Sequence, residues 1–199
     1  MKKNKKYGPW TRGHELKYWD RNGIQKGTDI YNKYFQAFKM EDYDFEGKVV
    51  GDIGCGPFGG VFCNNMSSNI IPIDILADDY NEMGHCGKKI VMGDLYKGLP
   101  FEENYFDYII CTNAIDHIPD VQTGFDEIFR VIKLGGIAFI HVHLRRKDQL
   151  SSGHIHYIDL NKVKSMIGKF EIINMEEDVD WVNDEMGRKA AYLILRKPQ

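Results

Sequence analysis

Seven short runs of β-branched and aromatic residues, separated by segments of helical character, constrain the fold of this 199-residue chain more than any other feature. Several runs, such as IIPIDI at 70–75 and YIICT at 108–112, are apolar at successive positions, which is typical of strands that are buried on both faces. Such strands belong to largely parallel sheets with helices on each side. The expected strands are 48–53, 70–75, 90–92, 108–112, 137–144, 170–176 and 190–196.

The intervening segments predict helices of unequal quality. Residues 121–133 carry apolar side chains at helical spacing, and the glycine pair at 135–136 predicts the end of that helix. A second helix is expected after Asp159, whereas 58–68 and 77–87 contain asparagine and glycine and should be short or irregular. The alternation predicts an α/β fold, a doubly wound Rossmann-like seven-stranded mostly parallel sheet with helices on both faces. Ligands of such sheets bind at the carboxyl ends of the strands.

The length indicates one compact domain overall, with two parts. Residues 1–46 are polar and rich in aromatic side chains, and we expect them to form a helical cap or lid. Aromatic residues in this part, among them Trp19, either stack on a flat substrate or cover the sheet edge. Residues 47–199 form the predicted ligand-binding domain. The sequence contains no internal repeat.

Charge and cysteine usage limit the partners and the compartment. With a net charge of −3, the chain has no overall positive potential that would attract nucleic acid. The lysines of the first six residues are expected to form a solvated tail. The four cysteines include no C-x-x-C pair and are interpreted as reduced thiols. We see no apolar run of the ~18 residues that span a bilayer and no signal peptide, so a cytoplasmic protein is expected.

A glycine-rich turn follows the first expected strand, and acidic residues end the first three. The sequence GDIGCGPFGG at 51–60 lets a ligand approach the backbone closely. Its spacing is compatible with a dinucleotide site. Asp52 inside the turn would repel a pyrophosphate and instead favours a cationic ligand. Asp74 and Asp94 end the second and third strands, in positions suited to ribose hydroxyls and a purine amino group.

In order and spacing, GDIGCGP, the Asp74 strand end, residues 93–120 and EIFRVIKLGGIAFI at 127–140 resemble the motifs of the class I S-adenosylmethionine-dependent methyltransferases, most closely the small-molecule, methyltransferase-11-like branch. The resemblance covers about half of the chain, and Leu134 departs from a frequent family proline. It implies S-adenosyl-L-methionine as cofactor. The cofactor-binding positions that it implies are Asp52, Gly54, Cys55, Gly56, Asp74, Ile75, Gly93, Asp94, Leu95, Asn113 and Ala114.

Methyl transfer from a sulfonium is an in-line displacement, so positioning supplies most of the catalysis and no covalent protein nucleophile is needed. A hydroxyl acceptor requires a base. The candidate catalytic residues are Asp116, His117 and His154, which follow the fourth and fifth strands. His117 at a helix start is also compatible with a packing or capping role.

Four histidines form two H-x-H pairs, His141 with His143 and His154 with His156. In extended backbone each pair places both rings on one face. No acidic or cysteine partner with diagnostic spacing accompanies them, so we expect no metal ion.

The predicted function is methyl transfer to a small polar acceptor, with O-methylation of a sugar hydroxyl in glycan biosynthesis favoured. The alternatives are N-methylation of a small metabolite, a nicotinamide-dependent oxidoreductase, and a non-catalytic module that binds S-adenosylmethionine. A small-molecule or glycan acceptor is the expected partner, without nucleic acid or a membrane span. The sequence leaves the oligomeric state open.

Overall fold

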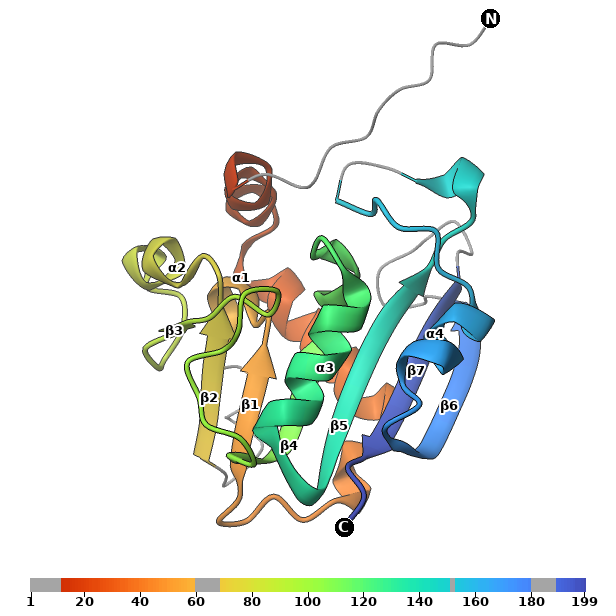
Figure 1. Cartoon of the computed structure of the whole chain (residues 1–199). Helices are drawn as coiled ribbons and strands as arrows, with labels where there is room; N and C mark the ends of the chain where they lie inside the picture. Colours follow the sequence, from red (N-terminus) through yellow and green to blue (C-terminus); the bar gives the residue numbers. More distant parts are fainter. Residues whose placement is uncertain (1–11, 60–68, 151–152, 180–188) are drawn as a thin grey trace, which may run out of the picture.

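The computed structural model describes residues 12–59, 69–150, 153–179 and 189–199. One seven-stranded sheet with the order β3-β2-β1-β4-β5-β7-β6 forms the centre of the molecule (Figure 1). The strands are β1 (Val49–Ile53), β2 (Asn69–Asp74), β3 (Val91–Met92), β4 (Phe106–Thr112), β5 (Ile132–Leu144), β6 (Glu171–Val179) and β7 (Lys189–Arg196).

The pairing in the sheet is mostly parallel. Strands β1 to β5 pair in parallel, and β7 runs antiparallel to both of its neighbours, β5 and β6. The predicted fold class is confirmed, and each of the seven expected strands has a counterpart. The carboxyl ends of β1, β2 and β5 meet at one edge, which is uppermost in Figure 1.

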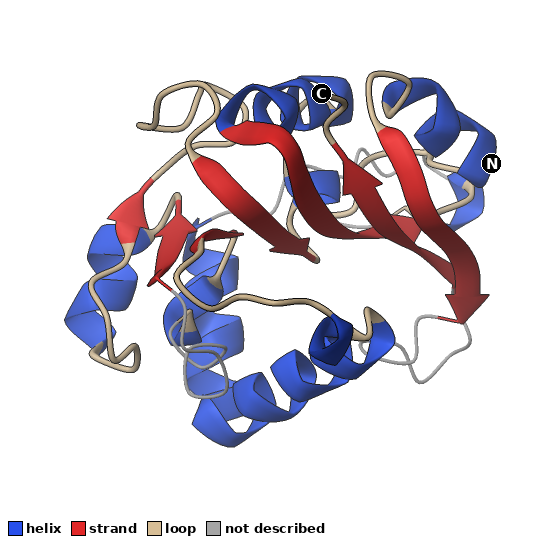
Figure 2. Cartoon of the chain, turned by 90° about the horizontal axis from the view of Figure 1, so that it is seen from below, coloured by secondary structure: helices blue, strands red, loops and turns tan. Residues whose placement is uncertain are grey.

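Helices cover both faces of the sheet, as the view from below shows (Figure 2). The α-helices are α1 (Arg12–Ala37), α2 (Ala77–Met83), α3 (Val121–Val131) and α4 (Leu160–Met166). Short 3-10 turns lie at η1 (Met40–Asp42), η2 (Gly56–Phe58), η4 (Ile115–His117) and η5 (Lys147–Gln149). Helices α3 and α4 share one apolar core with the sheet, and α1 shares another on the opposite face.

Side-chain caps fix where α3 and α4 begin. The Asp120 carboxylate accepts a hydrogen bond from the backbone N–H of Thr123, and Asp159 accepts one from Lys162. An aspartate at this position satisfies an N–H group that has no partner within the helix. The helix predicted after Asp159 is therefore confirmed.

The predicted end of the 121–133 helix was wrong. Helix α3 ends at Val131, and β5 begins directly at Ile132, which pairs with Phe106. Pairing then resumes between Tyr108 and Ile137, so the glycine pair lies in an irregularity of β5 rather than at a helix terminus. Gly135, within this irregularity, has a φ of 74°, in the left-handed region that glycine adopts most readily.

The weak helix predictions had different outcomes. Helix α2 has only seven residues and ends at Gly84, which has a left-handed backbone. Most of the 58–68 segment lies outside the described residues. The same holds for the lysine-rich start of the chain. Among the described residues, none of the helices combines the length and the apolar character that a membrane span requires.

Helix α1 reaches from the apolar core to the carboxyl edge of the sheet. At its end, Tyr34 and Phe38 are buried, and the Phe38 ring contacts the rings of Phe139 and Tyr192. Nearer its start, Trp19 packs against Phe58 beside the turn after β1. Arg12 forms an ion pair with Asp79 of α2. The helix thus covers the edge where ligands of this fold class bind.

Candidate functional site

The turn after β1 lies directly against the segment that follows β4. Gly54 has a φ of 70°, and a Cβ atom built on it would lie 2.3 Å from the Cβ of Ala114. Gly56 has a φ of 62°, and its Cβ would lie 3.4 Å from the ring of Trp19. Cys55 between them is buried, and its carbonyl accepts a hydrogen bond from the Tyr31 hydroxyl. Side chains at either glycine would disturb this packing.

Two buried carboxylates lie at the ends of the neighbouring strands β1 and β2. The Oδ2 atom of Asp52 has no hydrogen-bond partner among the described residues. The Asp74 oxygens accept backbone hydrogen bonds from Gly56, at 3.0 Å, and from Leu76, at 2.9 Å. Burial raises the pKa of Asp74 to about 6, and burial together with the charge of Asp74 raises the pKa of Asp52. A ligand that brings positive charge and hydroxyl donors would stabilise both ionised groups.

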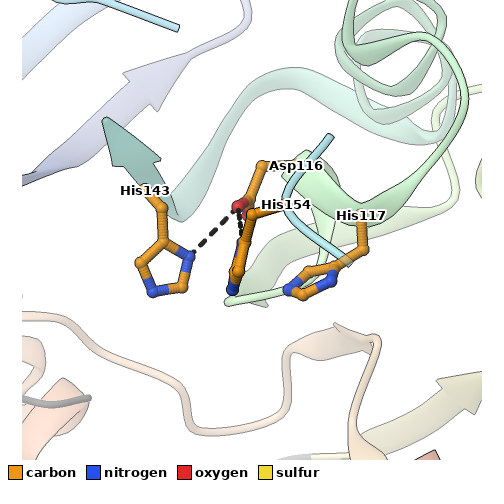
Figure 3. Close-up of side chains that lie close together, drawn as sticks. All are labelled: Asp116, His117, His143 and His154. Carbon is orange, nitrogen blue, oxygen red and sulfur yellow. Dashed lines mark hydrogen bonds and ion pairs between the residues drawn. The ribbon is translucent and has the colours of Figure 1, made fainter. Parts of the chain in front are cut away.

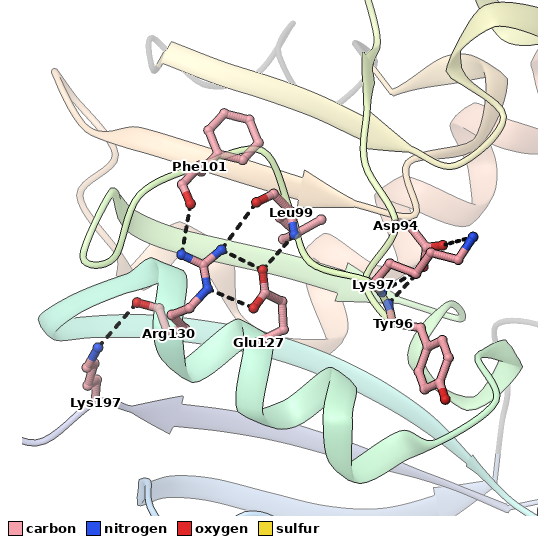
Figure 4. A network of polar contacts seen from close by, with 8 residues as sticks. All are labelled: Asp94, Tyr96, Lys97, Leu99, Phe101, Glu127, Arg130 and Lys197. Carbon is pink, nitrogen blue, oxygen red and sulfur yellow. Dashed lines mark hydrogen bonds and ion pairs between the residues drawn. The ribbon is translucent and has the colours of Figure 1, made fainter.

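The third acidic residue lies in a tight turn after β3. The Oδ1 atom of Asp94 accepts hydrogen bonds from the backbone N–H groups of Tyr96 and Lys97, and Oδ2 lies 3.5 Å from the Lys97 ammonium (Figure 4). Leu95 is buried in the core, so its contact with any ligand would come from the backbone. A Cβ on Gly93 would lie 2.5 Å from Ile73, which explains glycine there by packing.

Helix α3 anchors the loop that carries Asp94. Glu127 accepts a hydrogen bond from the backbone N–H of Leu99, at 2.6 Å. Arg130 pairs with Glu127 and donates to the carbonyls of Leu99 and Phe101 (Figure 4). These contacts hold the 94–101 loop against the domain.

A cluster of Asp116, His117, His143 and His154, here called the acceptor-edge cluster, lies at the ends of β4 and β5 (Figure 3). One oxygen, Asp116 Oδ2, lies 3.1 Å from His143 Nδ1 and 3.0 Å from His154 Nδ1. The rings of His117 and His154 are 4.4 Å apart between centroids. Three separate segments meet in this cluster, and they bring the three predicted catalytic residues together with His143.

The electrostatics of the cluster favour an ionised aspartate. Burial by itself would raise the pKa of Asp116, but the charges of His143 and His117 and the hydrogen bonds from His143 and His154 hold it well below its ordinary value. Burial lowers the pKa of His117 to about 4, against the attraction of Asp116. The cluster thus presents a carboxylate next to a neutral His117 imidazole at pH 7.

The two predicted H-x-H pairs behave differently. His141 and His143 share a face of β5, and their rings are 4.8 Å apart. His154 joins the acceptor-edge cluster, whereas His156 Nε2 hydrogen-bonds the carbonyl of Ile118. The pattern of alternation predicted the first pair correctly because it lies in a regular strand.

The remaining predicted positions line the same edge. Asn113 has a left-handed backbone, with a φ of 54°, and its Oδ1 lies 3.5 Å from His117 Nε2. Ile75 is 54% exposed directly after Asp74, which leaves an apolar surface beside the buried carboxylates.

Sequence reasoning gave Trp19 of α1 two alternative roles and assigned none to Glu15, which lies near the same turn. Trp19 donates a hydrogen bond to Glu15, and the Glu15 charge contributes to the raised pKa of Asp74. Only tertiary packing brings α1 to this edge, although the aromatic composition of the N-terminal part was a signal. Whether α1 is a lid over a substrate stays a prediction.

The sequence of this chain is similar to those of known methyltransferases. Residues 51–140 match the family model described as a methyltransferase domain. A sterol 24-C-methyltransferase from Schizosaccharomyces pombe is 33% identical over 116 residues, which are 53% of this chain and 30% of the relative. A ubiquinone biosynthesis O-methyltransferase from Glaesserella parasuis is 26% identical over 137 residues, covering 62% of this chain and 57% of the relative.

A solved structure has the same fold. The phosphoethanolamine N-methyltransferase 2 of Haemonchus contortus, in complex with phosphomonomethylethanolamine and S-adenosylhomocysteine, has a TM-score of 0.66 and 17% identity. The similarity covers 85% of this chain and 53% of that one. The chain thus spans less than two thirds of the length of each of these three proteins.

Proposed function

We propose that this chain, which matches a methyltransferase domain at residues 51–140, is a class I S-adenosylmethionine-dependent methyltransferase that transfers the methyl group of S-adenosylmethionine to a small polar acceptor. The observation that carries the proposal is the shared edge of the sheet. Asp52 and Asp74 flank the glycine turn there, and the acceptor-edge cluster follows the adjacent strands β4 and β5.

The acids and the glycine turn suit the cofactor. The Oδ2 atom of Asp52, which has no hydrogen-bond partner among the described residues, can bind a positively charged group of the methionine part. Each Asp74 oxygen accepts one backbone hydrogen bond and retains a lone pair for a ribose hydroxyl. Ile75 offers its exposed apolar side chain to the adenine, and Asp94 and the Leu95 backbone offer polar contacts.

The acceptor-edge cluster suits an acceptor that loses a proton. When a hydroxyl attacks the methyl carbon, a C–O bond forms, the C–S bond breaks with its electron pair staying on sulfur, and the hydroxyl proton passes to a base. His154 or His117 takes that proton in our proposal, and the ionised Asp116 orients His154 through the 3.0 Å contact. Closure of the site by α1 would exclude water from the sulfonium.

We further propose a sugar hydroxyl as the acceptor, in glycan biosynthesis, and the cytoplasm as the compartment. The cluster offers polar imidazoles, and the His141 ring, which contacts both His143 and Tyr34 of α1, adds an aromatic surface nearby, a combination compatible with a polyhydroxylated ring. Cys55, Cys86 and Cys111 are free thiols, which agrees with a reducing compartment.

Titration calorimetry with S-adenosylhomocysteine and with NAD tests the cofactor. We expect S-adenosylhomocysteine to bind and NAD not to bind. Asp52→Asn should weaken S-adenosylhomocysteine binding about tenfold or more, since a charge-assisted contact is lost. Asp126→Asn is the matched control, because the Asp126 carboxylate is partly exposed on α3 and its partners are Gln122 and the exposed Lys169. Binding of NAD without binding of S-adenosylhomocysteine would refute the proposed cofactor.

Mass spectrometry of a panel of sugars, nucleotide sugars and amines incubated with S-adenosylmethionine tests the acceptor. His154→Ala should lower turnover by about 10²-fold or more, as loss of a general base does, and leave S-adenosylhomocysteine affinity unchanged. His156→Ala, two residues away but outside the cluster, is the control. Turnover that survives both His154→Ala and His117→Ala would refute the base assignment, and methylation of amines alone would refute the sugar acceptor.

A further inference from the structure

Four side chains of the acceptor-edge cluster bring metal-ligating atoms together. One ligating atom each of Asp116, His117, His143 and His154 lies within 4.8 Å of the other three. The sequence showed no acidic partner for the histidines at a diagnostic spacing. The fold supplies Asp116, which is separated from His143 by 27 residues and from His154 by 38.

The distances are close to those that coordination requires. Tetrahedral ligands at 2.0–2.1 Å from a zinc ion are separated from one another by about 3.3 Å. Asp116 Oδ2 lies 3.1 Å from His143 Nδ1 and 3.0 Å from His154 Nδ1, so two edges of such a tetrahedron already exist. His117 and His154 are only partly buried, and small rotations of their rings can close the remaining edges.

A second observation points to a missing ligand. Asp116 is 2% exposed, and its Oδ1 atom has no hydrogen-bond partner among the described residues. Buried carboxylate oxygens nearly always have a partner. A cation that Asp116 contacts through both carboxylate oxygens would give Oδ1 a partner and would balance the negative charge of the carboxylate.

We propose that Asp116, His117, His143 and His154 bind a late first-row divalent cation of the zinc type. Three imidazole nitrogens and one carboxylate oxygen are a donor set for Zn²⁺ or Co²⁺, whereas Mg²⁺ prefers oxygen ligands. Arg145 lies two residues beyond His143, directly after the end of β5, and its charge, which lowers the pKa of His117, opposes a cation. The charge of Asp116 offsets that of Arg145.

The inference is independent of the proposed function, because binding is measured without cofactor or acceptor. It also bears on that function. Coordination uses the nitrogen lone pairs that would otherwise take the acceptor's proton. A given imidazole nitrogen can therefore act either as a metal ligand or as the base, but not as both at once.

The test uses the untagged chain of residues 1–199, freed of metal with a chelator. Titration with Co²⁺, followed by visible absorption, and with Zn²⁺, followed by calorimetry, should each give one equivalent, and Mg²⁺ should give no binding. His143→Ala and His154→Ala should weaken Zn²⁺ affinity about tenfold or more. The matched controls His141→Ala and His156→Ala, each from the same H-x-H pair as a ligand, should keep it.

Thermal melts of each variant separate lost ligands from lost folding. His154 tolerates substitution better than His143, since 19% of its side chain is exposed against 3% for His143, so it keeps the test decisive even where His143→Ala does not fold. Absence of stoichiometric Zn²⁺ binding to the wild-type protein overturns the proposal. Equal Zn²⁺ affinity of His154→Ala and the wild type also overturns it, because the ion then binds elsewhere.

Discussion

Replacing Gly54 by alanine should destabilise the protein and abolish cofactor binding. Its φ of 70° lies in the left-handed region, and an added Cβ would lie 2.3 Å from the Cβ of Ala114. The backbone conformation costs about 1–2 kcal/mol for an alanine. Relief of the overlap adds about 1–3 kcal/mol, as overpacking does. The expected loss in the free energy of unfolding is therefore about 2–5 kcal/mol.

Gly84→Ala is the matched control, because it measures the cost of the left-handed backbone conformation without a steric overlap. Gly84 has a φ of 67°, almost the same as Gly54, but no atom lies within 4 Å of its added Cβ. Its substitution should cost only the backbone part, about 1–2 kcal/mol. The difference between the two variants, measured by urea denaturation monitored by circular dichroism, isolates the overlap with Ala114.

A double-mutant cycle identifies the clashing atom. Ala114→Gly removes the Cβ that an alanine at position 54 would meet, so the pair Gly54→Ala with Ala114→Gly should show a favourable coupling of about 1–3 kcal/mol. S-adenosylhomocysteine affinity should recover in parallel. A coupling near zero, or a Gly54→Ala variant no less stable than Gly84→Ala, would show that the two segments do not pack as described.

Three further outcomes are expected. Because burial raises the pKa of Asp74 to about 6, ionisation of Asp74 destabilises the ligand-free fold, so lowering the pH from 7 to 5 should remove about 1 kcal/mol of that penalty. The gain should disappear in Asp74→Asn, and S-adenosylhomocysteine should bind the wild type less tightly at pH 5. Lys197→Met should cost about 2–3 kcal/mol of unfolding free energy, since the Lys197 ammonium donates to the carbonyls of Phe129 and Ile132 and to Asn104. The exposed control Lys169→Met should change stability by less than about 0.5 kcal/mol, and equal losses in the two variants would contradict the assignment. Glu127→Gln should increase hydrogen exchange at the Leu99 amide relative to wild type, and unchanged exchange would show that Glu127 does not anchor the loop.

Periodicity and turn chemistry made much of the fold predictable from sequence. Runs that are apolar on both faces identified the strands, and Asp159 marked the start of α4 through a local hydrogen bond. The glycine pair at 135–136 misled the prediction. Glycine permits both a helix end and a bulge, and long-range pairing of Ile132 with Phe106 selects the bulge.

The sequence by itself determined where the strands, the glycine turn and the acids that end the strands lie, because periodicity and turn chemistry act between neighbours along the chain. Only the tertiary structure decided which histidines meet. Asp116, His143 and His154 come from different segments. The H-x-H spacing does not indicate that His154 contacts Asp116 whereas His156 hydrogen-bonds the carbonyl of Ile118. Parallel strands with their carboxyl ends at one edge bring such residues together, and that order is a property of the whole sheet.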